Sequence, residues 1–148
     1  RFEWLLEKTT EIGVDEITPW LCERSQRTSL RIPRLEKVII AAMKQSLRCK
    51  LPKLNEPVEF RTFVRHSCPG QRFIAWCESG LESGLFRLIK PDNAITVAIG
   101  PEGDFTSEEI GMARENGFVP VSLGTSRLRT ETAGILVCCG IRLLHEGI

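Results

Sequence analysis

The chain has 148 residues, of which 42% are hydrophobic and 26% are charged, and its formal net charge at pH 7 is only +1. These values are typical of one globular domain with a substantial core, and no apolar run reaches the length of a membrane span. The six cysteines form no C-x-x-C pair, and the two histidines do not lie at metal-ligand spacing to them. The composition therefore predicts a cytoplasmic protein with reduced thiols, no metal and no membrane attachment.

Charge is concentrated in one segment despite the nearly neutral total. Between Cys22 and Lys53, nine basic residues stand against two acidic ones, which gives this segment +7 and leaves −6 for the remainder. A solvated helix surface is the ordinary explanation for exposed lysine and arginine. An imbalance of this size nevertheless favours a polyanionic partner, and we expect the segment to face nucleic acid.

The first half of the chain begins with a helical pattern. Apolar residues at helical spacing predict an amphipathic helix that ends at Gly13. Residues 14–21 are expected to form a short strand near a sheet edge, because Pro19 lies within them. After a polar, basic loop, Pro33 suits the first turn of a second helix with a continuous apolar stripe.

The second half alternates strands and helices. The expected elements are a small strand or helical turn at 58–64, strands at 72–77, 94–99 and 119–123, and helices at 107–116 and 131–145. Residues 78–90 contain two glycines and give no clear assignment. The last helix is apolar almost all round, so we expect it to be covered by the core and by a second copy of the protein. The alternation predicts an α/β fold with a mainly parallel sheet and helices on both faces.

Two turns at strand ends are the candidate functional elements. Gly100-Pro-Glu-Gly103 follows the strand at 94–99, and Thr106 and Glu109 then have the spacing of a capping box that starts a helix. A strand, a glycine turn and a capped helix are typical of a ligand site, and the two glycines allow backbone to approach a ligand closely. A turn without a ligand fits these residues equally well. Because consecutive parallel strands often neighbour each other, we expect this turn to meet a second polar turn at 123–133.

Five motifs in this order resemble the RsmE family of ribosomal RNA methyltransferases, which belongs to the SPOUT superfamily. The motifs are Thr10-Glu-Ile-Gly13, Glu23-Arg-Ser25, Gln45-Ser-Leu-Arg48, Ile99-Gly-Pro-Glu-Gly103 and Leu128-Arg-Thr-Glu-Thr-Ala133. The resemblance implies a SPOUT-type methyltransferase domain over residues 1–148, with a deep trefoil knot in its C-terminal part. It also implies an N-terminal PUA-like domain and a first strand, which these residues do not contain.

The resemblance further implies a function and its partners. The expected cofactor is S-adenosyl-L-methionine, and the expected reaction methylates N3 of a uridine in 16S rRNA of the small ribosomal subunit. The protein is expected to act as a homodimer through its C-terminal helix region. Two alternatives remain open, which are methylation of a ribose 2′-oxygen in RNA and RNA binding without catalysis. A phosphometabolite enzyme is a weaker possibility, because neither turn has a nearby catalytic His, Cys or Lys.

The same resemblance assigns site residues. Arg129 is expected to stabilise the uracil anion that develops as N3 loses its proton. Glu102 is a candidate proton acceptor. A structural role, in which the negative charge favours a helix start, is an equal alternative for Glu102 and is the favoured role for Glu131. Asp104 stands where many relatives have a second glycine, which should change the surface of the turn without abolishing it. The expected cofactor-binding residues are Ile99, Gly100, Gly103, Leu123, Gly124, Leu128, Arg129, Thr130 and Ala133, and the expected RNA-binding residues are Arg24, Arg27, Lys44, Gln45 and Arg48.

Overall fold

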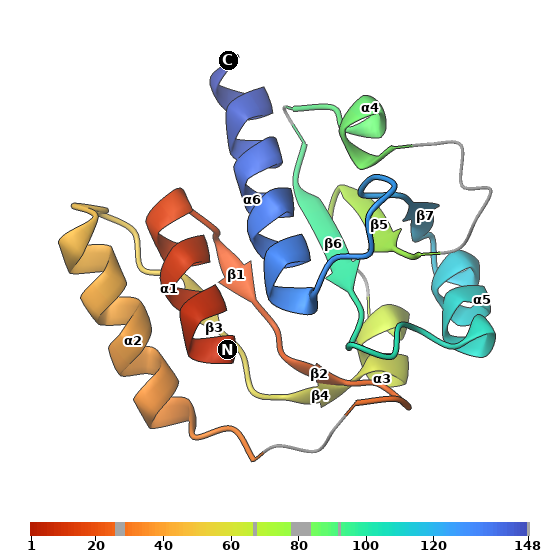
Figure 1. The fold of residues 1–148 in the computed structure, drawn as a ribbon, viewed down its shortest axis with the longest axis horizontal. Helices are drawn as coiled ribbons and strands as arrows, with labels where there is room; N and C mark the ends of the chain where they lie inside the picture. Colours follow the sequence, from red (N-terminus) through yellow and green to blue (C-terminus); the bar gives the residue numbers. More distant parts are fainter. Residues whose placement is uncertain (26–28, 67, 78–83, 92, 148) are drawn as a thin grey trace.

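The computed structural model describes residues 1–25, 29–66, 68–77, 84–91 and 93–147. Helices and strands alternate along this part of the chain (Figure 1). In order they are α1 (Phe2–Ile12), β1 (Glu16–Ile17), β2 (Trp20–Leu21), α2 (Ile32–Gln45), β3 (Lys53–Leu54), β4 (Val58–Glu59), α3 (Phe60–Arg65), β5 (Gln71–Ala75), α4 (Leu85–Leu88), β6 (Ile95–Ile99), α5 (Ser107–Glu115), β7 (Val119–Val121) and α6 (Thr130–Glu146).

The central sheet has three parallel strands in the order β6-β5-β7. Phe73 of β5 is in register with Val97 of β6 and with Val119 of β7. The expectation that β6 and β7 are neighbours is therefore wrong. The strand most deeply buried on both faces, β5, takes the central position, and its Phe73 and Ile74 are 3% and 0% exposed. Two further parallel pairs, β1 with β3 and β2 with β4, lie outside this sheet.

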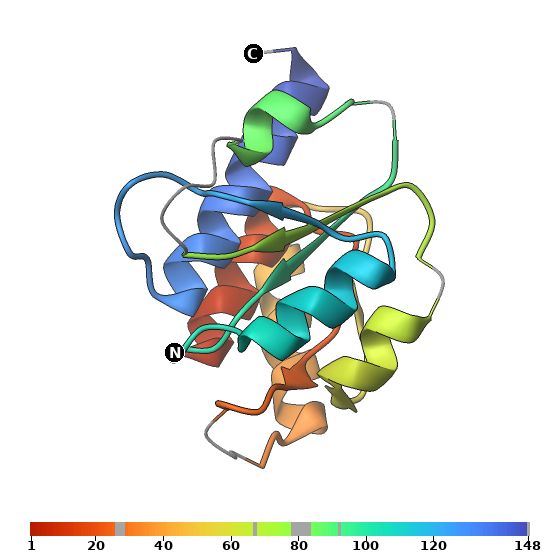
Figure 2. The ribbon, with the colours of Figure 1, turned by 90° about the vertical axis from the view of Figure 1, so that its right-hand side faces the viewer.

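Helices cover both faces of the central sheet (Figure 2). Successive side chains of a strand point to opposite faces, so Phe73 packs in a cluster with Val137 of α6, whereas Ile74 packs in a cluster with Phe60 of α3 and Ile110 of α5. A further layer is added by α1, which packs against both α6 and α2. The predicted α/β fold with parallel strands and helices on both faces is confirmed.

Several predicted boundaries agree with the structure. The first helix ends at Gly13, whose φ of +116° places it in the left-handed region that favours glycine, and Pro33 lies in the first turn of α2. The segment 14–21 is divided at Pro19 into β1 and β2. Residues 58–64 were expected to form a small strand or a helical turn, and the structure has both, as β4 followed by α3. The two-residue β3 and the short α4 were not predicted, and residues 78–83 lie outside the described part.

Close helix contacts set the position of α6. A Cβ atom added at Gly134 would lie 2.8 Å from Cδ1 of Leu5, so the absence of a side chain lets α1 approach α6. This contact places the start of α6 beside the start of α1, at the edge of the sheet where β6 ends (Figure 1). No helix in the described ranges is long and apolar enough to cross a membrane.

Candidate functional site

The two strand-end turns meet at the carboxyl edge of the sheet. The Thr130 hydroxyl donates a hydrogen bond of 2.8 Å to the Gly100 carbonyl, and Ile99 and Leu123 pack against the same hydrophobic cluster. One nitrogen of the Arg127 guanidinium also donates to the Glu102 carbonyl, at 3.3 Å. The predicted meeting of the turns is therefore observed. It results from the shared direction of β6, β5 and β7 and not from direct pairing of β6 with β7.

The glycines of the first turn, residues 99–103, are packed against protein side chains. A Cβ atom added at Gly100 would lie 3.1 Å from the Phe105 ring, and one added at Gly103 would lie 3.2 Å from Cβ of Arg24. The Arg24 guanidinium also donates to the Gly103 carbonyl at 2.8 Å. These glycines therefore make room for Phe105 and Arg24. This packing disagrees with the interpretation that the two glycines leave the backbone open to a ligand.

Asp104 fits the backbone conformation of the first turn. Its φ is +61°, a left-handed value that Asp adopts more readily than most residues because its short carboxylate can bond locally. One carboxylate oxygen accepts from the Phe105 amide at 2.8 Å, and the other accepts from the Cys77 amide at 3.1 Å. Burial, together with the Asp104 charge, raises the pKa of the Cys77 thiol. The expectation that Asp104 preserves the turn agrees with this geometry.

The predicted capping box is present and makes one further connection. The Thr106 hydroxyl accepts from the Glu109 amide at 3.2 Å, and a Glu109 carboxylate oxygen accepts from the Thr106 amide at 2.9 Å. The other oxygen of Glu109, a residue only 2% exposed, accepts from the Glu23 amide at 2.9 Å. Glu109 therefore ties the segment 22–25 to the start of α5, just after the first turn. The sequence predicted the box from local spacing, whereas the link to Glu23 has no local signal.

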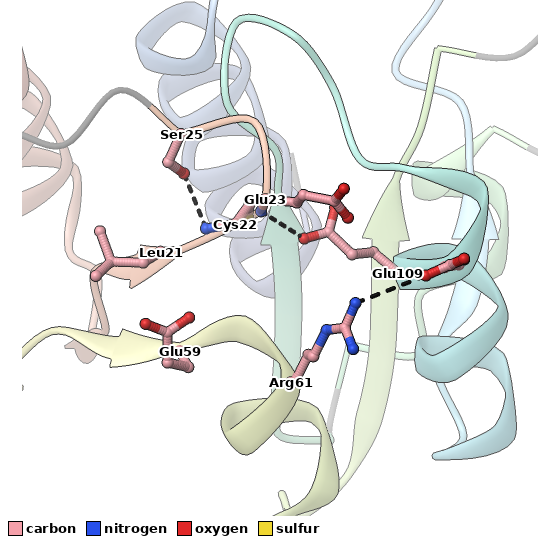
Figure 3. A pocket seen from close by; sticks show the side chains of 8 residues that line it. Leu21, Cys22, Glu23, Ser25, Glu59, Arg61 and Glu109 are labelled. Atoms are coloured by element: carbon pink, nitrogen blue, oxygen red, sulfur yellow. Dashed lines mark hydrogen bonds and ion pairs between the residues drawn. The ribbon is translucent and has the colours of Figure 1, made fainter.

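A pocket of about 340 Å³ lies beside this link (Figure 3). None of its described lining residues belongs to either of the two turns. Burial, with a further contribution from the Glu109 charge, raises the pKa of the Cys22 thiol to about 12. Such a thiol stays protonated near neutral pH and is a poor nucleophile. Arg61 forms an ion pair of 3.6 Å with Glu108 at the pocket. The remaining lining residues are Leu21, Glu23, Ser25 and Glu59.

The second turn is more open in its first part, residues 122–129. Gly124 has a φ of +125°, and a Cβ atom added there would meet no atom within 4 Å. The hydrogen bonds recorded at Gly124 are both with the Ser122 hydroxyl two residues earlier, at 3.1 Å each. Leu123 and Leu128 are half-buried. An added group at Gly124 therefore meets no protein atom, unlike one at Gly100 or Gly103.

The charged candidates at this edge differ in their surroundings. Arg129 is exposed and precedes the first turn of α6 without a side-chain capping bond. Glu102 is also exposed, and its carboxylate pairs with the Arg1 guanidinium at 2.8 Å. Glu131 lies in the first turn of α6, where its negative charge favours the helix. Among the residues that the structure describes, no group of three or more His, Cys, Asp or Glu could hold a metal ion.

The predicted RNA-binding residues are not gathered in one place. Arg24 bonds to the first turn, and Arg48 donates to the Glu11 carbonyl at 2.9 Å and to the Ile12 carbonyl, which caps the end of α1. Lys44 and Gln45 are exposed in the last turn of α2, at the end remote from the carboxyl edge of the sheet (Figure 1). Arg27 lies outside the described residues.

Known proteins are similar to this chain over nearly its whole length. A family profile described as an RNA methyltransferase domain matches residues 1–141. A relative from Mesomycoplasma hyopneumoniae named ribosomal RNA small subunit methyltransferase E is 33% identical over 92% of this chain and 61% of its own length. A protein of the same name from Synechocystis sp. is 32% identical over 98% of this chain and 50% of its own length. The chain therefore spans about half to three-fifths of the length of these relatives.

Solved structures share the fold. A probable rRNA methyltransferase from Porphyromonas gingivalis superposes with a TM-score of 0.88 at 38% identity, over 99% of this chain and 63% of that one. A putative methyltransferase from Legionella pneumophila, solved with the bound cofactor SAM, has a TM-score of 0.87 at 31% identity, over 97% of this chain and 61% of that one. With the profile match over residues 1–141, these similarities show that the chain belongs to the RNA methyltransferase domain family and, within it, to the relatives of ribosomal RNA small subunit methyltransferase E.

Proposed function

We propose that this chain is the catalytic domain of an S-adenosylmethionine-dependent methyltransferase that acts on N3 of a uridine in 16S rRNA. The observation that carries the proposal is the open space at Gly124 beside the protein-held turn at 99–103, in a chain of this family. Two of the solved neighbours, from Legionella pneumophila and Neisseria gonorrhoeae, are described as bound to S-adenosylmethionine.

The residues at the edge fit such a cofactor. Leu123 and Leu128 are half-buried and offer apolar surface for a flat adenine ring. The backbone of the second turn supplies amides and carbonyls around Gly124, where an added atom meets no protein. Ala133 lies in the first turn of α6 and is 6% exposed. When bound, the cofactor would supply a methyl group already activated on a sulfonium.

The chain's own residues would position the uracil and stabilise its charge. As the new bond to N3 forms and the methyl–sulfur bond breaks, N3 must lose its proton. The Arg129 guanidinium is exposed at the start of α6, and a positioned cation stabilises the anion that develops on the base. Glu102 is our candidate for the proton acceptor, because its carboxylate is 62% exposed and lies in the first turn.

Three features of the whole enzyme belong to the proposal. We propose a deep trefoil knot in the C-terminal part, which is supported by the central place of β5 and by the bond from Thr130 back to Gly100. We propose a homodimer through α6, which is supported by Leu143, an apolar side chain 46% exposed on that helix. We also propose a PUA-like domain and a cytoplasmic location for the whole enzyme, as the resemblance to the RsmE family implies; the proposal is supported by relatives of which this chain spans about half to three-fifths.

Product analysis tests the proposal. The chain is incubated with labelled S-adenosylmethionine and 16S rRNA lacking the modification, as a transcript and within small subunits, and the nucleosides are identified by mass spectrometry. We expect 3-methyluridine. A ribose-methylated nucleoside would support the 2′-oxygen alternative instead. The absence of S-adenosylmethionine binding in calorimetry would support a non-catalytic RNA-binding module.

A further inference from the structure

Most cations of the basic segment are engaged by the protein itself. Of the nine basic residues from Cys22 to Lys53, five have a side chain that pairs with a backbone carbonyl or a carboxylate of the protein, and Arg27 lies outside the described residues. The five are Arg24 with the Gly103 carbonyl, Arg34 with Glu3, Arg48 with the end of α1, Lys50 with Asp15, and Lys53 with Glu16. No side-chain hydrogen bond or ion pair to another described residue is recorded for Arg31, Lys37 and Lys44, and two of these three lie at the start of α2.

Arg31 and Lys37 line a broad groove of about 720 Å³. Its floor is apolar and consists of Leu30, Ile32 and Pro33. Leu30 and Ile32 pack against the buried cluster that joins α1 to α2, so the core holds this floor in place. Arg34 and Glu56 complete the lining.

The groove adjoins the candidate site. The start of α2 lies at the same end of the molecule as the carboxyl edge of the sheet (Figure 1). Arg34 pairs with Glu3 at 2.6 Å, and Arg1, two residues before Glu3, pairs with Glu102 of the first turn at 2.8 Å. The beginning of α1 therefore stands between the groove and the first turn and contacts both.

We propose that this groove binds a single-stranded segment of RNA next to the target nucleotide. Arg31 and Lys37 hold phosphates, and the apolar floor receives a base or ribose. The proposal rests on the proposed function, because it takes RNA as the substrate.

The lining favours RNA over a bare anion. An inorganic phosphate gains nothing from an apolar floor and is repelled by Glu56. A nucleotide uses all three parts of the lining, because its phosphate meets the cations, its ring covers the floor, and a 2′-hydroxyl or a base amino group donates to the Glu56 carboxylate.

The test compares two pairs of substitutions that remove the same charge. The variant R31Q/K37Q removes the two groove cations whose side chains have no hydrogen bond or ion pair with another described residue. The control R87Q/K90Q removes two exposed cations in and just after α4, at the opposite end of the molecule (Figure 1). Filter binding to an unmodified 16S rRNA transcript is measured over a range of KCl concentrations, and S-adenosylmethionine binding is measured by calorimetry.

We expect R31Q/K37Q to weaken RNA binding on the order of ten-fold. The slope of log affinity against log salt should fall by about 1.4, since each phosphate contact to a single strand contributes about 0.7. The control pair should stay within about two-fold of the wild type, and both variants should bind S-adenosylmethionine normally.

Equal losses of RNA affinity in the two variants would overturn the proposal, because total charge would then explain the binding. Unchanged RNA affinity in R31Q/K37Q would also overturn the proposal and would support an acidic protein partner for the groove. If the wild-type chain binds no RNA at low salt, the proposal that the groove binds RNA is contradicted, whether or not the chain binds S-adenosylmethionine. Conversely, a wild-type chain that binds RNA through the groove but makes no methylated nucleoside contradicts the proposed function alone.

Discussion

The two turns at the carboxyl edge of the sheet are built in different ways. The first turn is held from several directions, with its Gly100, Glu102 and Gly103 carbonyls each accepting a hydrogen bond from a side chain elsewhere in the chain. The second turn is held at Gly124 through Ser122, two residues away, and the neighbouring space is open. The first turn therefore has its shape before any ligand arrives, whereas the second presents the surface that a ligand can use.

This difference changes how a glycine-rich motif is understood. Gly-Pro-Glu-Gly suggests a backbone exposed to a ligand, yet Phe105 and Arg24 occupy the space beside its two glycines. We expect the functional chemistry at Gly124, where the space is open, and at Arg129, which is exposed and makes no side-chain capping bond. The predictions below test that division, beginning with the largest expected effect.

Arg129→Ala should lower the rate of methyl transfer on the order of 100-fold, because a positioned donor to a developing anion is removed. The melting temperature should change little, since Arg129 is exposed and makes no capping bond. Single-turnover kinetics and thermal unfolding check both expectations. The matched control is Arg127→Ala, which removes a neighbouring arginine that bonds to the first turn. Equal rates for the wild type and Arg129→Ala would remove this residue from the mechanism.

Gly124→Val should weaken S-adenosylmethionine binding by about 2 kcal/mol, or roughly 30-fold, because its side chain fills the open space. Calorimetry measures the affinity. The control is Gly147→Val, since Gly147 also has a positive φ of +71° and open space around it but lies at the end of α6. The two variants share backbone strain and differ in position. Unaltered affinity in Gly124→Val would place the cofactor elsewhere.

Glu109→Gln should lower the free energy of unfolding by about 1–2 kcal/mol. Glu109 is buried and accepts from the Thr106 and Glu23 amides with its two oxygens, and glutamine offers only one acceptor. Urea unfolding measures the change. Glu108→Gln is the control, because Glu108 is exposed and its surface ion pair with Arg61 contributes little. A similar free energy of unfolding in both variants would show that the link to residues 22–25 does not stabilise the fold.

Cys22 should make stability depend on pH in the alkaline range. The folded protein keeps the thiol proton up to a pKa of about 12, whereas the unfolded chain loses it near pH 8.5. The unfolded state therefore binds fewer protons in this window, and the free energy of unfolding falls as pH rises above about 8.5. Urea unfolding between about pH 8 and 10.5 should show a shallower decline for Cys22→Ala than for Cys49→Ala, which removes an exposed thiol. Identical declines would contradict a buried, protonated Cys22.

Local patterns in the sequence predicted much of this molecule. Helical spacing, Gly13 and Pro33 located the first two helices, and the Thr106–Glu109 spacing located the start of α5. Each of these signals depends on residues within a few positions of one another. The short α4 has no such signal, because four residues give no periodic pattern.

The long-range partners of side chains could not be predicted in the same way. The position of β5 between β6 and β7 depends on which strand is most buried, and the chain order does not contain that information. Arg24 and Arg48 belong to the basic segment by composition, yet each bonds to a carbonyl that is distant in sequence. Their roles at the first turn and at the end of α1 became visible only with the fold.

A crystal structure of this chain with S-adenosylmethionine or its demethylated product tests the central claim most directly. The account predicts the adenosine between residues 99–103 and 123–133, in contact with Gly124 and with the first turn unchanged. Density for the ligand in the pocket beside Cys22 and Glu59, or a first turn that must open to admit it, would contradict the account.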